Sequence, residues 1–197
     1  MELLRISVAT KNRHKVEEAN IALKSFGIEL VPVDVPKVEI QSDDLREIAI
    51  YAARAAYQYL RRPVVVEDSG LFIDALNGFP GPYSSYVYRT IGVEGILKLM
   101  RGVEDRRARF VAVVAFALRE DWIEVFEGVV EGTIAEEARG SHGFGFDPIF
   151  VPFGETRTFA EMSSEEKTRY SHRGRAFRKL GEWIAKNIDK LKPLLQT

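Results

Sequence analysis

A basic cluster at residues 11–15, with the sequence KNRHK, follows the first apolar segment of the chain. That segment predicts a β-strand, and the apolar residues after it recur at helical spacing until Gly27. The cluster therefore lies where a strand turns into a helix, and Asn12 can cap that helix. Helix-start amides lack intrahelical partners and carry the positive end of the helix dipole, so this position suits a polyphosphate. A capped helix with solvated charges is the alternative interpretation.

Two acidic residues, Glu67 and Asp68, come with Ser69 at the end of an apolar run, which predicts a short strand over residues 63–68. Open α/β sheets bind their ligands at the carboxyl ends of such buried strands. Successive side chains of a strand point to opposite faces, so at most one of the two acids should enter a given cleft. We favour Asp68. Alternatively, both carboxylates cap neighbouring backbone and Gly70 only makes the turn.

The segment GSHGFGFDPIF places Phe144 and Phe146 beside Asp147 in a loop that is rich in glycine. Large aromatic side chains in an exposed loop need a reason to be there, and a planar base stacked on one ring would supply it. Packing of both rings in the core is the competing interpretation. The glycines do not have the spacing of the dinucleotide-binding fingerprint, and no helix is predicted after them.

A second basic segment, SHRGRAFRK at residues 171–179, opens a predicted helix, where cations oppose the helix dipole. An anionic or carbonyl-bearing ligand would compensate for them, whereas Ser171 as a simple cap with solvated charges is the other possibility. The three histidines lack the close spacing of a zinc site. The sequence has neither a Walker loop nor a nucleophile elbow.

The elements that must position these groups follow from the apolar patterns. The chain opens as strand, helix, strand, helix, strand, and two long β-rich runs later in the chain predict an antiparallel hairpin. These patterns predict an α/β protein with a mixed sheet and two continuous lobes. The expected elements are a strand at 28–35, a helix capped by Asp44, a helix at 92–100, hairpin strands at 108–120 and 122–136, and a helix at 171–191.

The composition is that of an ordinary globular chain: 197 residues, 46% hydrophobic and 29% charged. The formal net charge of −1 gives no general attraction to nucleic acid, so no stable nucleic-acid partner is expected. The absence of cysteine excludes disulfides, thiolate zinc sites and a cysteine nucleophile. No run reads as a signal peptide or a membrane span, so no membrane association and a cytoplasmic location are expected.

Taken in order along the chain, five motifs resemble the HAM1 or inosine triphosphate pyrophosphatase family of noncanonical purine nucleoside triphosphate pyrophosphatases. They are T-x-N-x-x-K from Thr10 to Lys15, VEDSGL followed by NGFPGPYS, GFGFDPIF, FAEMSSEEK and SHRGRAF. The resemblance covers residues 6 to about 185. It implies an elongated mixed β-sheet flanked by helices, two lobes with a central cleft in a single domain over residues 1–197, and a homodimer.

The resemblance also implies a reaction. Water attacks ITP, dITP or XTP between the α and β phosphates with the help of Mg²⁺ and releases the monophosphate and pyrophosphate. Such chemistry requires positioned phosphates, charge neutralisation and an activated water. Carried over by motif, Asp68 would be the general base, and Glu39 with Asp68 would hold the metal.

The substrate contacts are carried over in the same way. Lys15 would act on the triphosphate both as a ligand and in catalysis, and His172 or Arg173 would donate to the 6-oxo group that adenine lacks. Many relatives have a lysine at the position of Ala52, and Arg54 is the nearby cation here. The residues implied to bind substrate are Thr10, Asn12, Lys15, Arg54, Ser69, Phe144, Gly145, Phe146, Asp147, Lys167, Ser171, His172 and Arg173.

Two other functions fit parts of the pattern. A nucleotide sensor without catalysis would keep the basic loop and the aromatic pocket but would need neither Glu39 nor Asp68. A related house-cleaning pyrophosphatase for modified pyrimidine nucleotides would share the hydrolysis but would not need the SHR segment.

Overall fold

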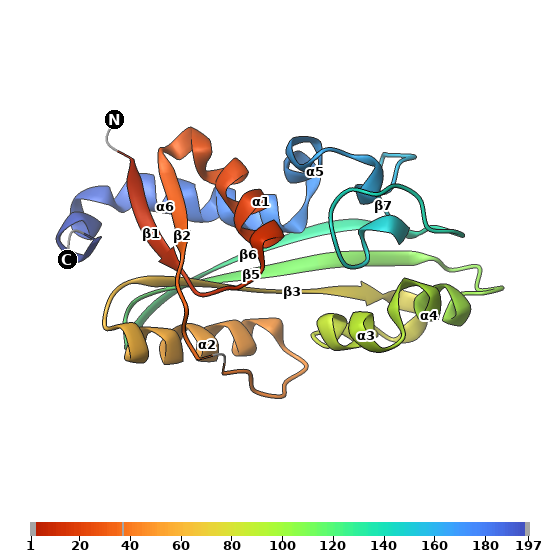
Figure 1. Cartoon of the computed structure of the whole chain (residues 1–197), viewed down its shortest axis with the longest axis horizontal. Helices are drawn as coiled ribbons and strands as arrows, with labels where there is room; N and C mark the ends of the chain where they lie inside the picture. Colours follow the sequence, from red (N-terminus) through yellow and green to blue (C-terminus); the bar gives the residue numbers. More distant parts are fainter. Residues whose placement is uncertain (1–2, 37, 196–197) are drawn as a thin grey trace.

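The computed structural model describes residues 3–36 and 38–195, and over these residues the chain forms a mixed β-sheet with helices on both faces (Figure 1). The strands are β1 (Leu4–Val8), β2 (Ile28–Pro32), β3 (Val64–Ile73), β4 (Pro80–Gly81), β5 (Arg107–Arg119), β6 (Trp122–Ile134) and β7 (Phe150–Pro152). They lie in the order β2-β1-β3-β5-β6-β7, and β4 pairs with β3 outside this path. Strand β1 is parallel to β2 and β3, whereas the pairs β3–β5, β5–β6 and β6–β7 are antiparallel.

The helices are α1 (Arg13–Leu23), α2 (Leu45–Leu60), α3 (Ser84–Thr90), α4 (Gly92–Leu99), α5 (Ser164–Tyr170) and α6 (His172–Leu195). Short 3₁₀ helices lie at Lys24–Phe26, Asp74–Leu76, Asp147–Ile149 and Phe159–Glu161. Figure 1 shows α1 and α6 on one face of the sheet and α2 on the other, with α3 and α4 near the far ends of the long strands. No helix in this described part of the chain is long and apolar enough to cross a membrane.

The long hairpin β5–β6 connects the two ends of the sheet, and its side chains alternate between the faces as the strand period requires. Residues 112, 114, 116 and 118 of β5 pack with α1 and α6, and residues 113, 115 and 117 pack with α2. A third buried cluster joins the other end of β3, β5 and β6 to α3, α4 and the segment from Phe146 to Met162. Each end of the sheet therefore has its own apolar core.

Much of the predicted architecture is confirmed. The opening order of strands and helices, the Asp44 cap, the antiparallel hairpin, the helix near 92–100 and the long C-terminal helix are all present. The second strand ends at Pro32 rather than at residue 35, because its partner β1 ends at Val8, the residue that pairs with Pro32. Helix α3 and strands β4 and β7 were not predicted. The division into two lobes of a single domain with a central cleft stays a prediction.

The prediction of a short strand over residues 63–68 was wrong, because β3 continues to Ile73. Its pairing explains the error. Strand β3 is parallel to β1 at only two residues, Val64 and Val65, whereas all ten of its residues pair with β5. The polar residues Glu67 to Ser69 therefore lie in the middle of a strand, just beyond the point where β1 ends. Gly70 follows them because a Cβ there would lie 2.2 Å from the carbonyl oxygen of Gly81 in β4.

Candidate active site

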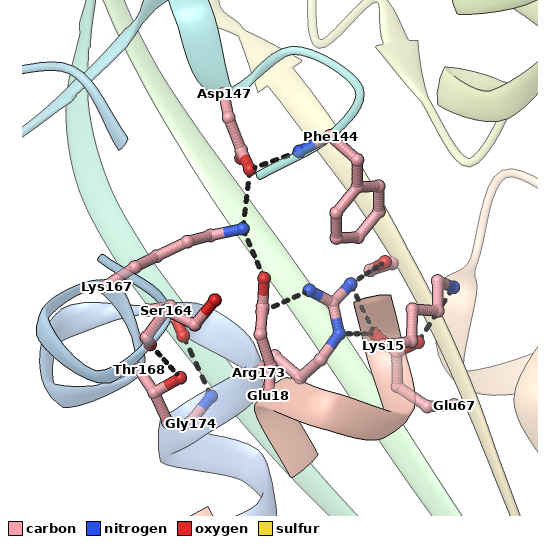
Figure 2. Close-up of polar contacts among 12 residues, drawn as sticks. Lys15, Glu18, Glu67, Phe144, Asp147, Ser164, Lys167, Thr168, Arg173 and Gly174 are labelled. Atoms are coloured by element: carbon pink, nitrogen blue, oxygen red, sulfur yellow. Dashed lines mark hydrogen bonds and ion pairs between the residues drawn. The ribbon is translucent and has the colours of Figure 1, made fainter. Parts of the chain in front are cut away.

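Six charged side chains from distant parts of the sequence form one connected chain of ion pairs (Figure 2). In order, this buried charge chain consists of Asp147, Lys167, Glu18, Arg173, Glu67 and Lys15. The shortest nitrogen–oxygen distances between successive members are 2.5–3.1 Å. Negative and positive groups alternate, so the charges of the six residues cancel although five of the six side chains are at most 4% exposed.

Helix α1 supplies two members of the chain, because Lys15 and Glu18 are three residues apart and share one face of the helix. Asn12 fixes the start of this helix, since its side chain accepts a hydrogen bond from the Lys15 amide. The hydroxyl of Thr10 in turn accepts one from the Asn12 amide. The predicted cap is confirmed, and it sets the direction from which Lys15 reaches Glu67.

Arg173 lies at the centre of the charge chain, in the first turn of α6. Its guanidinium donates to Glu18 at 2.7 Å, to Glu67 at 3.1 Å and to the hydroxyl of Ser69 at 3.0 Å. Ser171 caps the same turn by accepting from the Gly174 amide. The opposing charge for Arg173 therefore comes from the protein carboxylates of Glu18 and Glu67, a source that neither interpretation of this segment included.

The electrostatics of the two central acids follow from this pairing. Burial alone would raise the pKa of Glu18, but the charges of Arg173 and Lys167 outweigh it and hold the pKa below its ordinary value. Burial would also raise the pKa of Glu67, and Arg173 and Lys15 lower it instead to about 2. Both acids are therefore ionised at neutral pH, as their partners require.

Asp68 differs from Glu67 because it is on the opposite face of β3, the face whose strand residues Val64 and Val66 pack with α2. Its carboxylate accepts a hydrogen bond from the amide of Ser69 at 3.0 Å. Burial raises the pKa of Asp68 to about 6, with Lys15 opposing the shift and the negative charges of Glu67 and Glu39 adding to it. Asp68 is thus an acid that changes its charge near neutral pH, as a general base requires.

The two acids predicted to hold a metal can be tested by the chemistry of their groups. The negative charge of Glu39 contributes to the raised pKa of Asp68, so a cation beside the two carboxylates would relieve their repulsion. Within residues 3–36 and 38–195, no group of three or more His, Cys, Asp or Glu side chains is arranged to hold a metal. Mg²⁺ commonly uses one or two carboxylates and takes its other ligands from phosphates and water. The residues present therefore fit Mg²⁺ bound together with a phosphate substrate.

The two aromatic side chains of the glycine-rich loop have different environments. Phe146 is 3% exposed and packs in the core with the edge of its ring against Tyr88. Phe144 is half-buried, and its ring faces the cations of Lys167 and Arg173 at 4.9 and 5.3 Å from its centroid. Of the two rings, that of Phe146 is buried and that of Phe144 is partly exposed. Core packing is therefore confirmed for Phe146, and stacking of a base on Phe144 stays a prediction.

Asp147 holds the loop in this shape. Its carboxylate accepts from the amide of Phe144 at 2.9 Å and also pairs with Lys167. Gly143 has φ of +72°, and a Cβ there would lie 2.1 Å from the Asp147 carboxylate. The charge chain thus ends in the loop that presents the Phe144 ring. Gly145, the other residue of this loop that was predicted to bind substrate, directly follows Phe144 in the sequence.

His172 is buried, and its ring stacks on Phe110 with centroids 4.6 Å apart. Burial lowers the pKa of His172 well below its ordinary value, and the charges of Arg173, Lys167 and Lys15 lower it further. The imidazole is therefore neutral at neutral pH. Its Nδ1 atom has no hydrogen-bond partner among the described residues.

The other cations at the start of α6 bind protein carbonyls instead of a ligand. Arg175 donates to the carbonyl of Val129 and Lys179 to that of Glu127, both in β6. Arg178 donates to the carbonyls of Thr168 and Arg169. The last carbonyls of a helix such as α5 have no partner within the helix, so they can accept hydrogen bonds from a cation near the start of α6.

Arg54 does not join the candidate site. Its guanidinium contacts the carbonyl of Glu120, in the turn between β5 and β6, at 3.4 Å. The turn follows Ala117, which pairs with Val64 at the start of β3. Asp68 lies in the other direction, four residues along β3 from Val64, which is about 13 Å of strand. We therefore withdraw Arg54 from the substrate-binding set.

Sequence reasoning missed Glu18 and assigned no function to Glu67. A signal for Glu18 was available, because an acid three residues after Lys15 lies among the apolar positions Val16 and Ala19 of the same helix. A charged residue at a position that the helix pattern predicts to be buried needs a partner. The identity of that partner, Arg173, is not encoded locally.

Comparison with known proteins connects this geometry to a family. The model of the Ham1 family matches residues 6–183. A dITP/XTP pyrophosphatase of Hyperthermus butylicus is 53% identical over 184 residues, which cover 93% of this chain and 96% of that protein. The corresponding protein of Thermococcus kodakarensis is 50% identical over 185 residues, 94% of this chain and 100% of its own. A HAM1 protein structure from Coxiella burnetii superposes with a TM-score of 0.83 at 34% identity and covers 93% of this chain and 99% of that one.

Proposed function

The chain belongs to the Ham1 family, and from this premise we propose that it hydrolyses ITP, dITP and XTP to the monophosphate and pyrophosphate. It is a hydrolase acting on triphosphate anhydride bonds, as its relatives named dITP/XTP pyrophosphatase are. The observation that carries the proposal is Asp68, an acid with a pKa of about 6 beside Lys15. In the same site, Phe144 offers an aromatic ring at the other end of the buried charge chain.

At the phosphate end, Lys15 neutralises charge on the triphosphate, and Thr10 and Asn12 hold the turn that orients it. Asp68 accepts the proton of the attacking water, which forms a bond to the α phosphorus while pyrophosphate leaves. Asp68 and Glu39 would hold Mg²⁺, which when bound would neutralise the charges of the phosphates. Glu67 takes no proton, since its low pKa keeps it paired with Lys15 and Arg173.

At the base end, the purine stacks on the ring of Phe144, and His172 donates to its 6-oxo group. A neutral imidazole donates from only one of its two nitrogens, and the unpartnered Nδ1 of His172 is available for this bond. Lys167 and Ser171 hold the helices around the base. Arg173 acts as a positioning residue, because its bonds go to Glu18, Glu67 and Ser69.

A substrate panel tests the proposed function. ITP, dITP, XTP, ATP, GTP and modified pyrimidine triphosphates are each incubated with the enzyme and Mg²⁺, and pyrophosphate and orthophosphate are measured separately. Pyrophosphate from the deaminated purines is the expected result. Orthophosphate as the first product would mean cleavage at the γ phosphate. Binding without hydrolysis would favour the nucleotide sensor, and a preference for pyrimidines the other pyrophosphatase.

The proposal includes a homodimer, carried over from the family resemblance. Large apolar side chains are exposed close together in sequence at Phe79, Tyr83, Tyr86, Ile91 and Leu99, around α3 and α4, and exposed apolar surface of this kind favours association. Light scattering with size-exclusion chromatography gives the mass in solution and tests this part.

Replacing His172 by Ala is expected to narrow the preference for ITP over ATP. Because His172 is neutral, the lost hydrogen bond to the 6-oxo group is worth about 0.5–1.5 kcal/mol, hence about a 2- to 12-fold fall in the ITP-to-ATP ratio of kcat/KM. A cap or packing defect would instead lower both values of kcat/KM by a similar factor. The ratio is measured beside a thermal melt, and an unchanged ratio would remove His172 from base recognition.

A further inference from the structure

The imidazole of His14 stacks on Phe144, the ring to which the purine is assigned. The two ring centroids are 5.3 Å apart and the planes differ by 15°. These values are typical of an offset stacked aromatic pair. His14 belongs to the first turn of α1, directly before Lys15, and is exposed to solvent.

Among the described residues, three side chains stack on or lie over the ring of Phe144. Two of them, Lys167 and Arg173, are only 2–3% exposed because the buried charge chain holds them in place. The third, His14, is exposed, so a base that arrives from solvent at this ring meets His14. At 5.3 Å the two rings are in contact and leave no room for a third ring between them.

We propose that His14 makes an autoinhibitory contact, in which its ring occupies the stacking place of the purine on Phe144 until a base displaces it. The inference rests on the proposed function and deepens it. Because the side chain of His14 is exposed, it can turn into solvent without disturbing the core. A base must replace the existing contact between His14 and Phe144. The net free energy that it gains by stacking is therefore smaller than it would be on a Phe144 ring without His14.

The expected consequence is that replacing His14 by Ala tightens base binding. By isothermal titration calorimetry without metal, inosine should bind the His14→Ala variant about 2- to 12-fold more tightly than the unaltered protein, the fold-change that one aromatic pair is worth. Tripolyphosphate has no ring to stack and should gain no affinity. The comparison separates the ring of His14 from any charge it carries.

Two further variants serve as controls. His14→Phe keeps a ring on Phe144 and should not tighten inosine binding. His142→Ala removes an exposed histidine of the same glycine-rich loop that has no ring contact among the described residues, and it should leave inosine affinity unchanged. Unchanged or weaker inosine binding by His14→Ala would overturn the inference.

The outcome can be distinguished from failure of the proposed function. If the unaltered protein releases pyrophosphate from ITP but His14→Ala does not tighten inosine binding, only the assignment of His14 fails. If the unaltered protein neither hydrolyses ITP nor binds inosine, the proposed function fails and the assignment of His14 fails with it.

Discussion

Replacing Asp68 by Asn is expected to lower kcat for ITP hydrolysis by about 100- to 10,000-fold, the usual contribution of a general base. Asn has nearly the same shape and keeps an oxygen that can accept from the Ser69 amide, so the fold should be unchanged. What it loses is basicity and one negative charge beside Glu39. The measurement is steady-state release of pyrophosphate, with binding of ITP followed separately by calorimetry. Near-normal turnover would mean that Asp68 is not the base.

The pH dependence of the unaltered enzyme checks the same assignment. Burial raises the pKa of Asp68 to about 6 in the free protein, and a bound Mg²⁺ beside it would lower that pKa because the cation favours the carboxylate. We expect kcat measured with Mg²⁺ to be flat at neutral pH and to fall about tenfold for each pH unit below the pKa of Asp68 in the bound complex, which lies below 6. The residual activity of Asp68→Asn should lack this acidic limb. Asp74→Asn serves as a control, because Asp74 directly follows β3 and pairs with Arg109. This variant should have an unchanged kcat and the same fall of kcat at acidic pH.

Replacing Arg173 by Leu is expected to lower the free energy of unfolding by about 3–5 kcal/mol, the cost of leaving buried charges without their partner. Glu18 and Glu67 would both remain buried, and Glu18 would keep only Lys167. Denaturant titration gives the change in free energy. Because Arg173 bonds to protein groups, the loss of activity should affect ITP and ATP by the same factor, which contrasts with the prediction for His172.

A surface arginine provides the matched control. Arg157 pairs with Glu155 and Glu166, but its side chain is well exposed, so Arg157→Leu should change stability little. If Arg173→Leu were as stable as this control, the charge chain would not be the element that connects the phosphate end to the base end. If Arg173→Leu selectively reduced ITP hydrolysis, Arg173 would contact the base after all.

The amino-acid sequence was enough to predict most of the local elements and to locate the five motifs along the chain. Asn12 and Asp44 cap the predicted helices because their side chains reach amides two or three residues away. The runs at 108–120 and 122–136 predicted the antiparallel hairpin because both are rich in strand-forming residues and only a short polar turn separates them. Motif order along the chain was sufficient to indicate the family.

Which charged side chains pair with one another within the protein became visible only in the folded structure. Arg173 reaches Glu67 over a sequence separation of 106 residues and Glu18 over 155, so no local pattern indicates that these groups neutralise one another. The length of β3 also depends on contacts across space, because β3 pairs with β5 far beyond the point where β1 ends. The burial of the two loop aromatics does so too, since Phe146 is buried and Phe144 is only half-buried. Periodicity and capping depend on residues that are close in the sequence, so the sequence was enough to predict the helices and strands. Ion pairing and burial depend on residues that are distant in the sequence but close in the folded protein, so the arrangement of the candidate site required the structure.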